Sequence, residues 1–209
     1  MEMESTVSTA SSVVRKSKQS GFSLIEVMIS MIILAIGMLS VLAALGIAMG
    51  ANQTSQEDLI ARQLASEAME SIFTARNNSQ IPFSSINNTT SVPPGIFLPN
   101  NQAPMCAGPD GILDTIDDVA CLTAAGAVCP NGGIECLTEP GPDGVLGTPD
   151  DVVLSLANFT RNITITPLLD GNGNVIPTLV QVTITINYTV PNHGGTKSYV
   201  LDEYVSSYH

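Results

Sequence analysis

The sequence predicts an α+β fold in which one long N-terminal helix precedes a C-terminal antiparallel sheet. Two observations predict it. Residues 22–49 form an apolar run whose only ionisable side chain is Glu26. Residues 179–190 alternate apolar and polar side chains with a period of two, which is the pattern of a long strand with one buried face. Between these segments, a stretch rich in Cys, Asp and Gly predicts a disulfide-bonded acidic insertion.

The apolar run is long enough to cross a membrane. As a helix, residues 22–49 would rise about 42 Å, which exceeds the ~30 Å hydrocarbon core of a bilayer. A secretory signal has a shorter apolar region of roughly 7 to 15 residues, so this run does not fit one. The basic residues before it predict that the N-terminus stays in the cytoplasm and that everything after Met49 faces outward.

The helix is expected to continue beyond the membrane. Residues 51–76 lack Gly and Pro, and their apolar side chains recur at helical spacing opposite a charged face. This pattern predicts an amphipathic continuation that packs on the sheet. Residues 77–105 contain five prolines and several Asn pairs, which predicts an irregular loop crossing the sheet edge.

Glu26 needs a physical reason, because a carboxylate within an apolar span costs roughly 2.5 to 3.5 kcal/mol at the helix centre. The segment Gly21-Phe22-Ser23-Leu24-Ile25-Glu26-Val27 resembles the processing site of type IV prepilins and type II secretion pseudopilins. The resemblance implies that a membrane prepilin peptidase cleaves after Gly21 and that the new amine of Phe22 is methylated. It also implies that Glu26 pairs with the terminal amine of a neighbouring subunit during assembly. Two unlike charges attract strongly at low dielectric, which supports this role.

The resemblance further implies the type IV pilin fold and a structural role. Residues 34–45 and 62–70 look most like the minor pilins of the PilV type. The resemblance therefore implies a minor pilin that packs with other pilins in a filament, with pilus assembly, surface display and adhesion as its expected roles. It would be a single-pass inner-membrane protein with a periplasmic head before assembly and would be part of the extracellular pilus afterwards. The alternatives are a type II secretion pseudopilin and a membrane-anchored, calcium-dependent adhesin or binding module.

The net negative charge of the chain limits the kind of partner that it can bind. Removing a leader of residues 1–21 takes away three of the 7 basic and two of the 19 acidic side chains, which leaves 4 and 17 and a formal charge of −13. Nucleic acid is therefore excluded as a partner, because phosphate binding needs a basic surface.

An internal repeat lies in the acidic insertion. Residues 108–119 (GPDGILDTIDDV) and 141–152 (GPDGVLGTPDDV) agree at nine of twelve positions. Clustered carboxylates in tight loops suit Ca²⁺, which takes 6 to 8 oxygen ligands. The alternative is a pair of solvated β-turns with no metal. The candidate Ca²⁺ ligands are Asp110, Asp114, Asp117 and Asp118 in the first copy and Asp143, Asp150 and Asp151 in the second.

Four cysteines fall within the same insertion. An even number of Cys in an exported domain predicts two disulfides, and three pairings are possible. We favour one pair, Cys106 with Cys121, because it closes a ring around the first acidic loop, and the second pair is then Cys129 with Cys136. A zinc site is the alternative, which the missing CxxC spacing disfavours.

The C-terminal residues predict a three-stranded meander. Ile163 and Ile165 indicate a strand that joins the next one through a turn at residues 170–174, and residues 196–206 form the last strand after a turn at 191–195. Residues 152–156 are a candidate further strand. No nucleophile or phosphate-cradling motif is evident, so we predict that the protein is not an enzyme. The predicted organisation is a leader at 1–21, a membrane helix at 22–50, an amphipathic helix at 51–76, a loop at 77–105, a Cys-rich acidic repeat segment at 106–157 and a sheet at 158–209.

Overall fold

The computed structural model describes residues 21, 23–190 and 195–208. The predicted leader up to residue 20, Phe22 and most of the turn predicted at 191–195 lie outside the described residues. The chain divides into two compact units, residues 1–47 and residues 48–209. We call the second unit the head and describe each unit separately.

Helix α1 spans Leu24–Asn77, a run of 54 residues that contributes to both units. Its apolar side chains from Leu24 to Met49 are exposed, and the helix is long and apolar enough to cross a membrane. In the head, one face of the same helix is buried. The buried residues recur three or four positions apart, as an amphipathic helix requires: Ala61, Leu64, Ala65, Ala68, Met69, Ile72 and Ala75.

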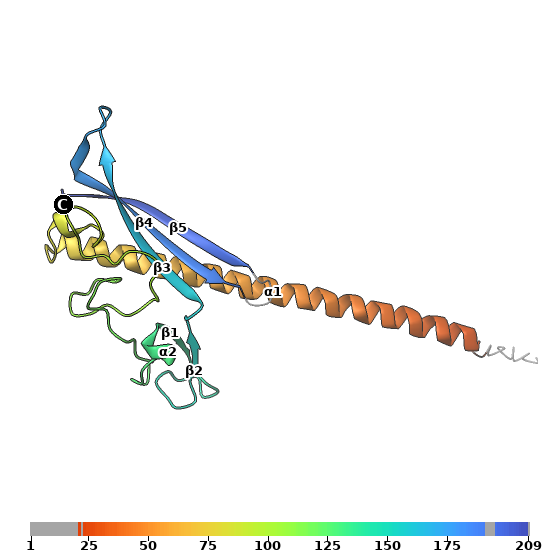
Figure 1. The fold of residues 1–209 in the computed structure, drawn as a ribbon. Helices are drawn as coiled ribbons and strands as arrows, with labels where there is room; N and C mark the ends of the chain where they lie inside the picture. Colours follow the sequence, from red (N-terminus) through yellow and green to blue (C-terminus); the bar gives the residue numbers. More distant parts are fainter. Residues whose placement is uncertain (1–20, 22, 191–194, 209) are drawn as a thin grey trace, which may run out of the picture. The chain divides into compact units, whose positions relative to one another are not determined.

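A three-stranded antiparallel sheet packs on the head portion of α1 (Figure 1). Its strands, β3 (Phe159–Leu169), β4 (Val175–Thr189) and β5 (Thr196–Ser206), follow in chain order, so the predicted meander is confirmed. Alternate side chains of β4 are buried, namely Val182, Ile184, Ile186 and Tyr188. The Tyr188 hydroxyl donates to the Asp58 carboxylate of α1, which ties the sheet to the helix.

The loop after α1 covers the outer edge of β3. It contains a short 3-10 helix, η1 (Phe83–Ser85), and then runs beside the strand. The side chain of Asn88 donates to the Ile163 carbonyl at 2.7 Å and accepts from the Ile165 amide at 2.9 Å. Gln102 exchanges two backbone hydrogen bonds with Arg161. Part of the backbone edge that β3 would otherwise expose is therefore satisfied.

The Cys-rich lobe, residues 106–156, contains the remaining elements. They are a single turn, α2 (Pro130–Gly133), and a separate two-stranded sheet of β1 (Cys136–Glu139) and β2 (Val152–Ser155). The predicted strand at 152–156 therefore exists, but it does not extend the meander. Its partner is β1, because the register places Cys136 opposite Ser155, and the Leu156 amide donates to the Glu135 carbonyl just before β1.

Candidate functional site: the repeat loops and the N-terminal segment

Two disulfides lie in the lobe. Cys106 pairs with Cys121 and Cys129 pairs with Cys136, which are the pairs favoured from the sequence. No free cysteine occurs in the part of the chain that the structure describes. The first bridge closes a ring of chain around residues 108–119, and Cys106 also exchanges backbone hydrogen bonds with Val119 across the base of this loop.

The sequence repeat is also a structural repeat. We call residues 108–119 loop 1 and residues 141–152 loop 2. In loop 1, the Asp110 carboxylate accepts from the Ile112 amide at 2.9 Å, and the Asp118 carboxylate accepts from the Asp114 amide at 2.8 Å. The same bonds recur 33 residues later, from Val145 to Asp143 and from Gly147 to Asp151. Equal side-chain chemistry at equal spacing therefore gives the same turn twice.

A threonine hydroxyl closes each turn. Thr115 donates to Asp117 at 2.6 Å, and Thr148 donates to Asp150 at 2.7 Å. These hydrogen bonds stabilise the ionised carboxylates, and they are the main cause of the lowered pKa of Asp117 and of Asp150. Burial acts oppositely on Asp118, whose pKa is raised.

Each loop requires glycine at the same place. A Cβ on Gly108 would lie 2.1 Å from the Asp117 carbonyl oxygen, and one on Gly141 would lie 2.3 Å from that of Asp150. A second shared position has a positive φ, 59° at Asp114 and 89° at Gly147. Gly adopts this left-handed conformation without strain and Asp tolerates it, which explains why the two copies differ there.

The carboxylates predicted as Ca²⁺ ligands mostly accept hydrogen bonds within their own loops. Loop 1 amides donate to Asp110, Asp117 and Asp118, and loop 2 amides donate to Asp143, Asp150 and Asp151 in the same way. Within the described ranges, no group of three or more His, Cys, Asp or Glu side chains is arranged to hold a metal ion. Calcium binding by the loops stays a prediction.

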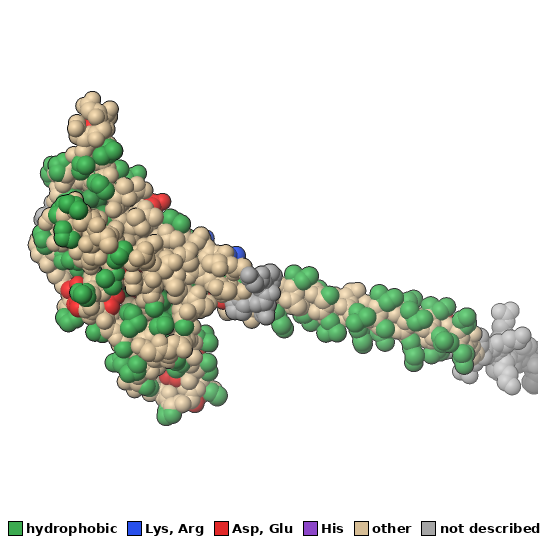
Figure 2. Space-filling view, viewed as in Figure 1, with side chains coloured by type: hydrophobic (Ala, Val, Ile, Leu, Met, Phe, Trp, Pro, Cys, Tyr) green, Lys and Arg blue, Asp and Glu red, His purple; other side chains and the backbone are tan. Residues whose placement is uncertain are grey.

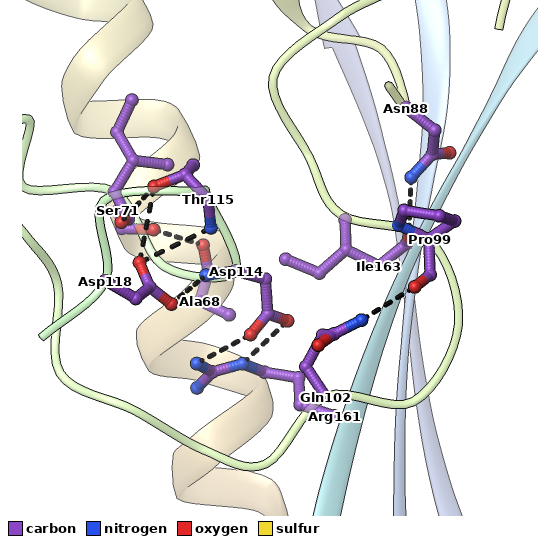
Figure 3. Close-up of polar contacts among 11 residues, drawn as sticks. Ala68, Ser71, Asn88, Pro99, Gln102, Asp114, Thr115, Asp118, Arg161 and Ile163 are labelled. Atoms are coloured by element: carbon purple, nitrogen blue, oxygen red, sulfur yellow. Dashed lines mark hydrogen bonds and ion pairs between the residues drawn. The ribbon is translucent and has the colours of Figure 1, made fainter. Parts of the chain in front are cut away.

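Asp114 differs from the other loop carboxylates because it is an anchor. Its carboxylate forms a two-pronged ion pair with Arg161 of β3, at 3.0 Å to Nε and 3.1 Å to Nη2 (Figure 3). The side chains are 1 % and 0 % exposed, so both charges are removed from water. Burial raises the pKa of Asp114, and the adjacent guanidinium opposes that rise. Arg161 thus fastens loop 1 to the inner face of the sheet.

Sequence reasoning missed Arg161, although a signal was present. Arg161, Ile163 and Ile165 alternate along β3, so all three point to the same, buried face of the sheet. It is also the only arginine after Arg76. A lone arginine at an inward position needs a buried carboxylate, and this requirement could have directed attention to the acidic loops.

Glu135, just before β1, is a second ionisable group that sequence reasoning missed, and its side chain is only partly exposed. Burial is the main cause that raises its pKa to about 7, the nearby carboxylate of Glu67 raises it further, and Arg161 opposes the rise. A group with a raised carboxyl pKa binds its proton more tightly in the folded state than in the unfolded chain. Between its ordinary pKa of 4.5 and about 7, the folded head therefore loses stability as pH rises.

Replacing Glu135 with Gln is expected to flatten this pH dependence. The variant should gain about 1 kcal/mol in unfolding free energy at pH 8 and little at pH 4.5, since Gln resembles the protonated acid and part of the Glu135 side chain remains exposed. Urea denaturation of the mature protein in detergent at both pH values, followed by circular dichroism, measures this. Glu139→Gln, at an exposed site in the same hairpin, is the control. An unchanged pH dependence in Glu135→Gln would contradict the assignment.

The N-terminal segment supplies the other candidate site. Gly21 is exposed, and no neighbouring atom lies within 4 Å of the place where a Cβ would be. The Ser23 carbonyl accepts hydrogen bonds from the amides of Glu26 and Val27 at the start of α1. The helix begins at Leu24, two residues after Phe22, whose new amine is predicted to pair with a neighbouring subunit's Glu26. Glu26 lies in the first helical turn, exposed among apolar side chains.

Gly21 is therefore exposed ahead of a helix that carries one carboxylate, Glu26, in its first turn. Residues 16–42 match the prokaryotic N-terminal methylation motif. The methylation motif includes Gly21, Phe22 and Glu26 and supports a type IV pilin-like or pseudopilin-like protein, which has a structural role in an assembly of pilins. The rest of the chain lies outside the motif, and comparisons with curated proteins and with solved structures found no match.

Proposed function

We propose that this protein is a minor pilin of the PilV type, a subunit that enters a type IV pilus through α1 and carries its acidic head on the filament surface. The observation that carries the proposal is the methylation motif directly ahead of an exposed apolar helix. An apolar helix surface of this length is unstable in water, so it requires either lipid or the helices of other subunits. A filament core of packed pilin helices would satisfy that requirement after the subunit leaves the membrane.

A pseudopilin of a type II secretion system is the second candidate, because the methylation motif supports it equally. Both candidates use the same processing and the same helix packing. They differ in the assembly that holds the mature chain, which is a long surface pilus in one case and a short periplasmic structure in the other.

The experiment that tests the proposal is mass spectrometry of the mature chain in membranes and in sheared surface filaments. An N-methylated Phe22 at the N-terminus in the filament fraction would support the minor pilin. The same N-terminus confined to the cell envelope would favour the pseudopilin. An intact Met1 or a start near Ala51 would overturn both.

Replacing Glu26 with Ala is expected to leave cleavage intact while lowering the filament-to-membrane ratio about tenfold. The variant loses the carboxylate that would pair with a neighbour's amine, and a pairing energy of about 1.4 kcal/mol corresponds to that factor. Immunoblots of the two fractions measure the ratio. Ser30→Ala is the matched control, because the Ser30 hydroxyl bonds only to the Glu26 carbonyl of its own helix. Normal incorporation of Glu26→Ala would rule out the pairing.

A further inference from the structure

Loops 1 and 2 have a similar backbone conformation but differ in what covers them. In loop 1, Ile112 and Leu113 are 0 % and 3 % exposed and belong to the core cluster with α1 and the sheet. Their counterparts in loop 2, Val145 and Leu146, are 54 % and 56 % exposed. Because the hydrogen bonds of the two loops are the same, each loop presents its apolar pair in the same way. Loop 1 has a partner within the chain, and loop 2 presents an equivalent pair to solvent.

Other exposed apolar side chains lie in the same lobe. Leu122 and Val128, 62 % and 60 % exposed, face each other in an isolated β-bridge of the same lobe. Loop 2 packs near this bridge, since a Cβ on Gly147 would lie 3.6 Å from the Ala124 carbonyl oxygen. A hollow of about 330 Å³ lies between loop 2 and the bridge segment, and its lining includes Val128, Pro130, Pro149 and Val153. We call these four exposed apolar side chains, Leu122, Val128, Val145 and Leu146, the lobe patch.

The charge around the lobe patch restricts what can cover it. Residues 106–156 contain nine acidic side chains and no Lys, Arg or His. Figure 2 shows carboxylates beside apolar side chains on the part of the head that holds the lobe. Asp143 and Asp150 are exposed within loop 2, and Glu139 is exposed two residues before it. A partner must therefore bring apolar side chains and a basic rim.

A second copy of this chain fits poorly. The mature chain would carry −13, and its basic side chains in the described part of the head are already engaged. Arg161 is buried against Asp114, Arg76 donates to the Ser206 carbonyl, Lys197 lies 3.6 Å from the Asp58 carboxylate and Arg62 stacks on Tyr199. Like charge would oppose two such heads in contact.

We propose that the lobe patch is a docking surface for a different pilin subunit, one that presents apolar side chains rimmed by Lys or Arg. The proposal rests on the minor-pilin function and names the partner that this function leaves open. Loop 2 would insert Val145 and Leu146 into the neighbour much as loop 1 buries Ile112 and Leu113 in its own core. The missing anchor supports this, because Gly147 stands where loop 1 has Asp114, so loop 2 has no carboxylate there that must find a buried arginine.

The test uses the full-length protein in its own cells. Val145→Ser with Leu146→Ser is expected to lower the filament-to-membrane ratio about tenfold, since two apolar side chains would no longer be buried. The matched control is Val92→Ser with Ile116→Ser, which removes two apolar side chains that are 97 % and 91 % exposed outside the patch. The control should enter filaments normally. Equal ratios for the two variants would overturn the proposal.

Photocrosslinking identifies the occupant and needs only one exposed substitution. Benzoylphenylalanine at position 146 should crosslink to another chain with a methylated N-terminus and more Lys and Arg than Asp and Glu in its head, and the same probe at position 116 should not. A crosslink to a second copy of this chain, to a protein that is not a pilin, or to nothing would overturn the proposal. If the wild-type chain is absent from sheared filaments yet crosslinks to such a pilin in membranes, the filament role fails and the docking surface stands.

Discussion

Replacing Asp114 with Gly is expected to lower the unfolding free energy of the head by about 3–5 kcal/mol. The change leaves Arg161 buried without its carboxylate, and an uncompensated buried charge has a cost of this size. Gly suits the positive φ of the position, as Gly147 shows in loop 2, so the backbone does not confound the result. Denaturation of the mature protein in detergent, followed by circular dichroism of the sheet, measures the loss.

Two further variants isolate the ion pair. Asp114→Gly combined with Arg161→Met should recover most of the loss, because no charge then remains buried. Gly147→Asp adds the same carboxylate to loop 2, where the position is exposed, and should cost less than about 1 kcal/mol. If Asp114→Gly were as mild as Gly147→Asp, the pair would not anchor loop 1.

Replacing both Cys106 and Cys121 with Ser is expected to cost about 3 kcal/mol. The bridge joins residues 15 apart, and a ring of that size removes about this much free energy of loop closure from the unfolded chain. Buried Cys121 adds a packing contribution. The Cys129 and Cys136 pair, 7 residues apart, should cost about 2 kcal/mol under the same treatment.

Protease sensitivity distinguishes the two bridges. Loss of the first should expose the chain around loop 1 to cleavage, since that bridge closes the ring that contains the loop. Loss of the second should leave the chain around loop 1 resistant. Cleavage at the same sites in both variants would show that the lobe unfolds as one unit and that the bridges have no separate local roles.

The main elements of the fold follow from local patterns. The apolar run and the amphipathic stretch after it predict α1, and the alternation through Val182, Ile184 and Ile186 predicts β4 and its buried face. Such patterns repeat over many residues, so a single ambiguous position changes little. The methylation motif likewise lies within one short stretch whose chemistry depends on neighbouring residues.

The lobe was harder to predict because its structure depends on distant contacts. β1 has four residues and no distinctive alternation, and its pairing with β2 becomes evident only once the Cys129–Cys136 bridge and the Glu135–Leu156 hydrogen bond are known. Asp114 and Arg161 are 47 residues apart, and the sequence pattern of neither residue specifies the other. The sequence shows the loop carboxylates but not the amide and hydroxyl donors that their own loops bring to them, because those hydrogen bonds depend on the turn geometry.

The left-handed position shared by the two loops has a consequence for how such a repeat diverges. Aspartate and glycine codons can differ in one base, and both residues are compatible with φ values of 59° and 89° at this site. A single mutation could therefore add or remove the anchoring carboxylate without a change of turn. Duplication of a stable structural loop would then supply new contact surfaces whose folding has already been selected.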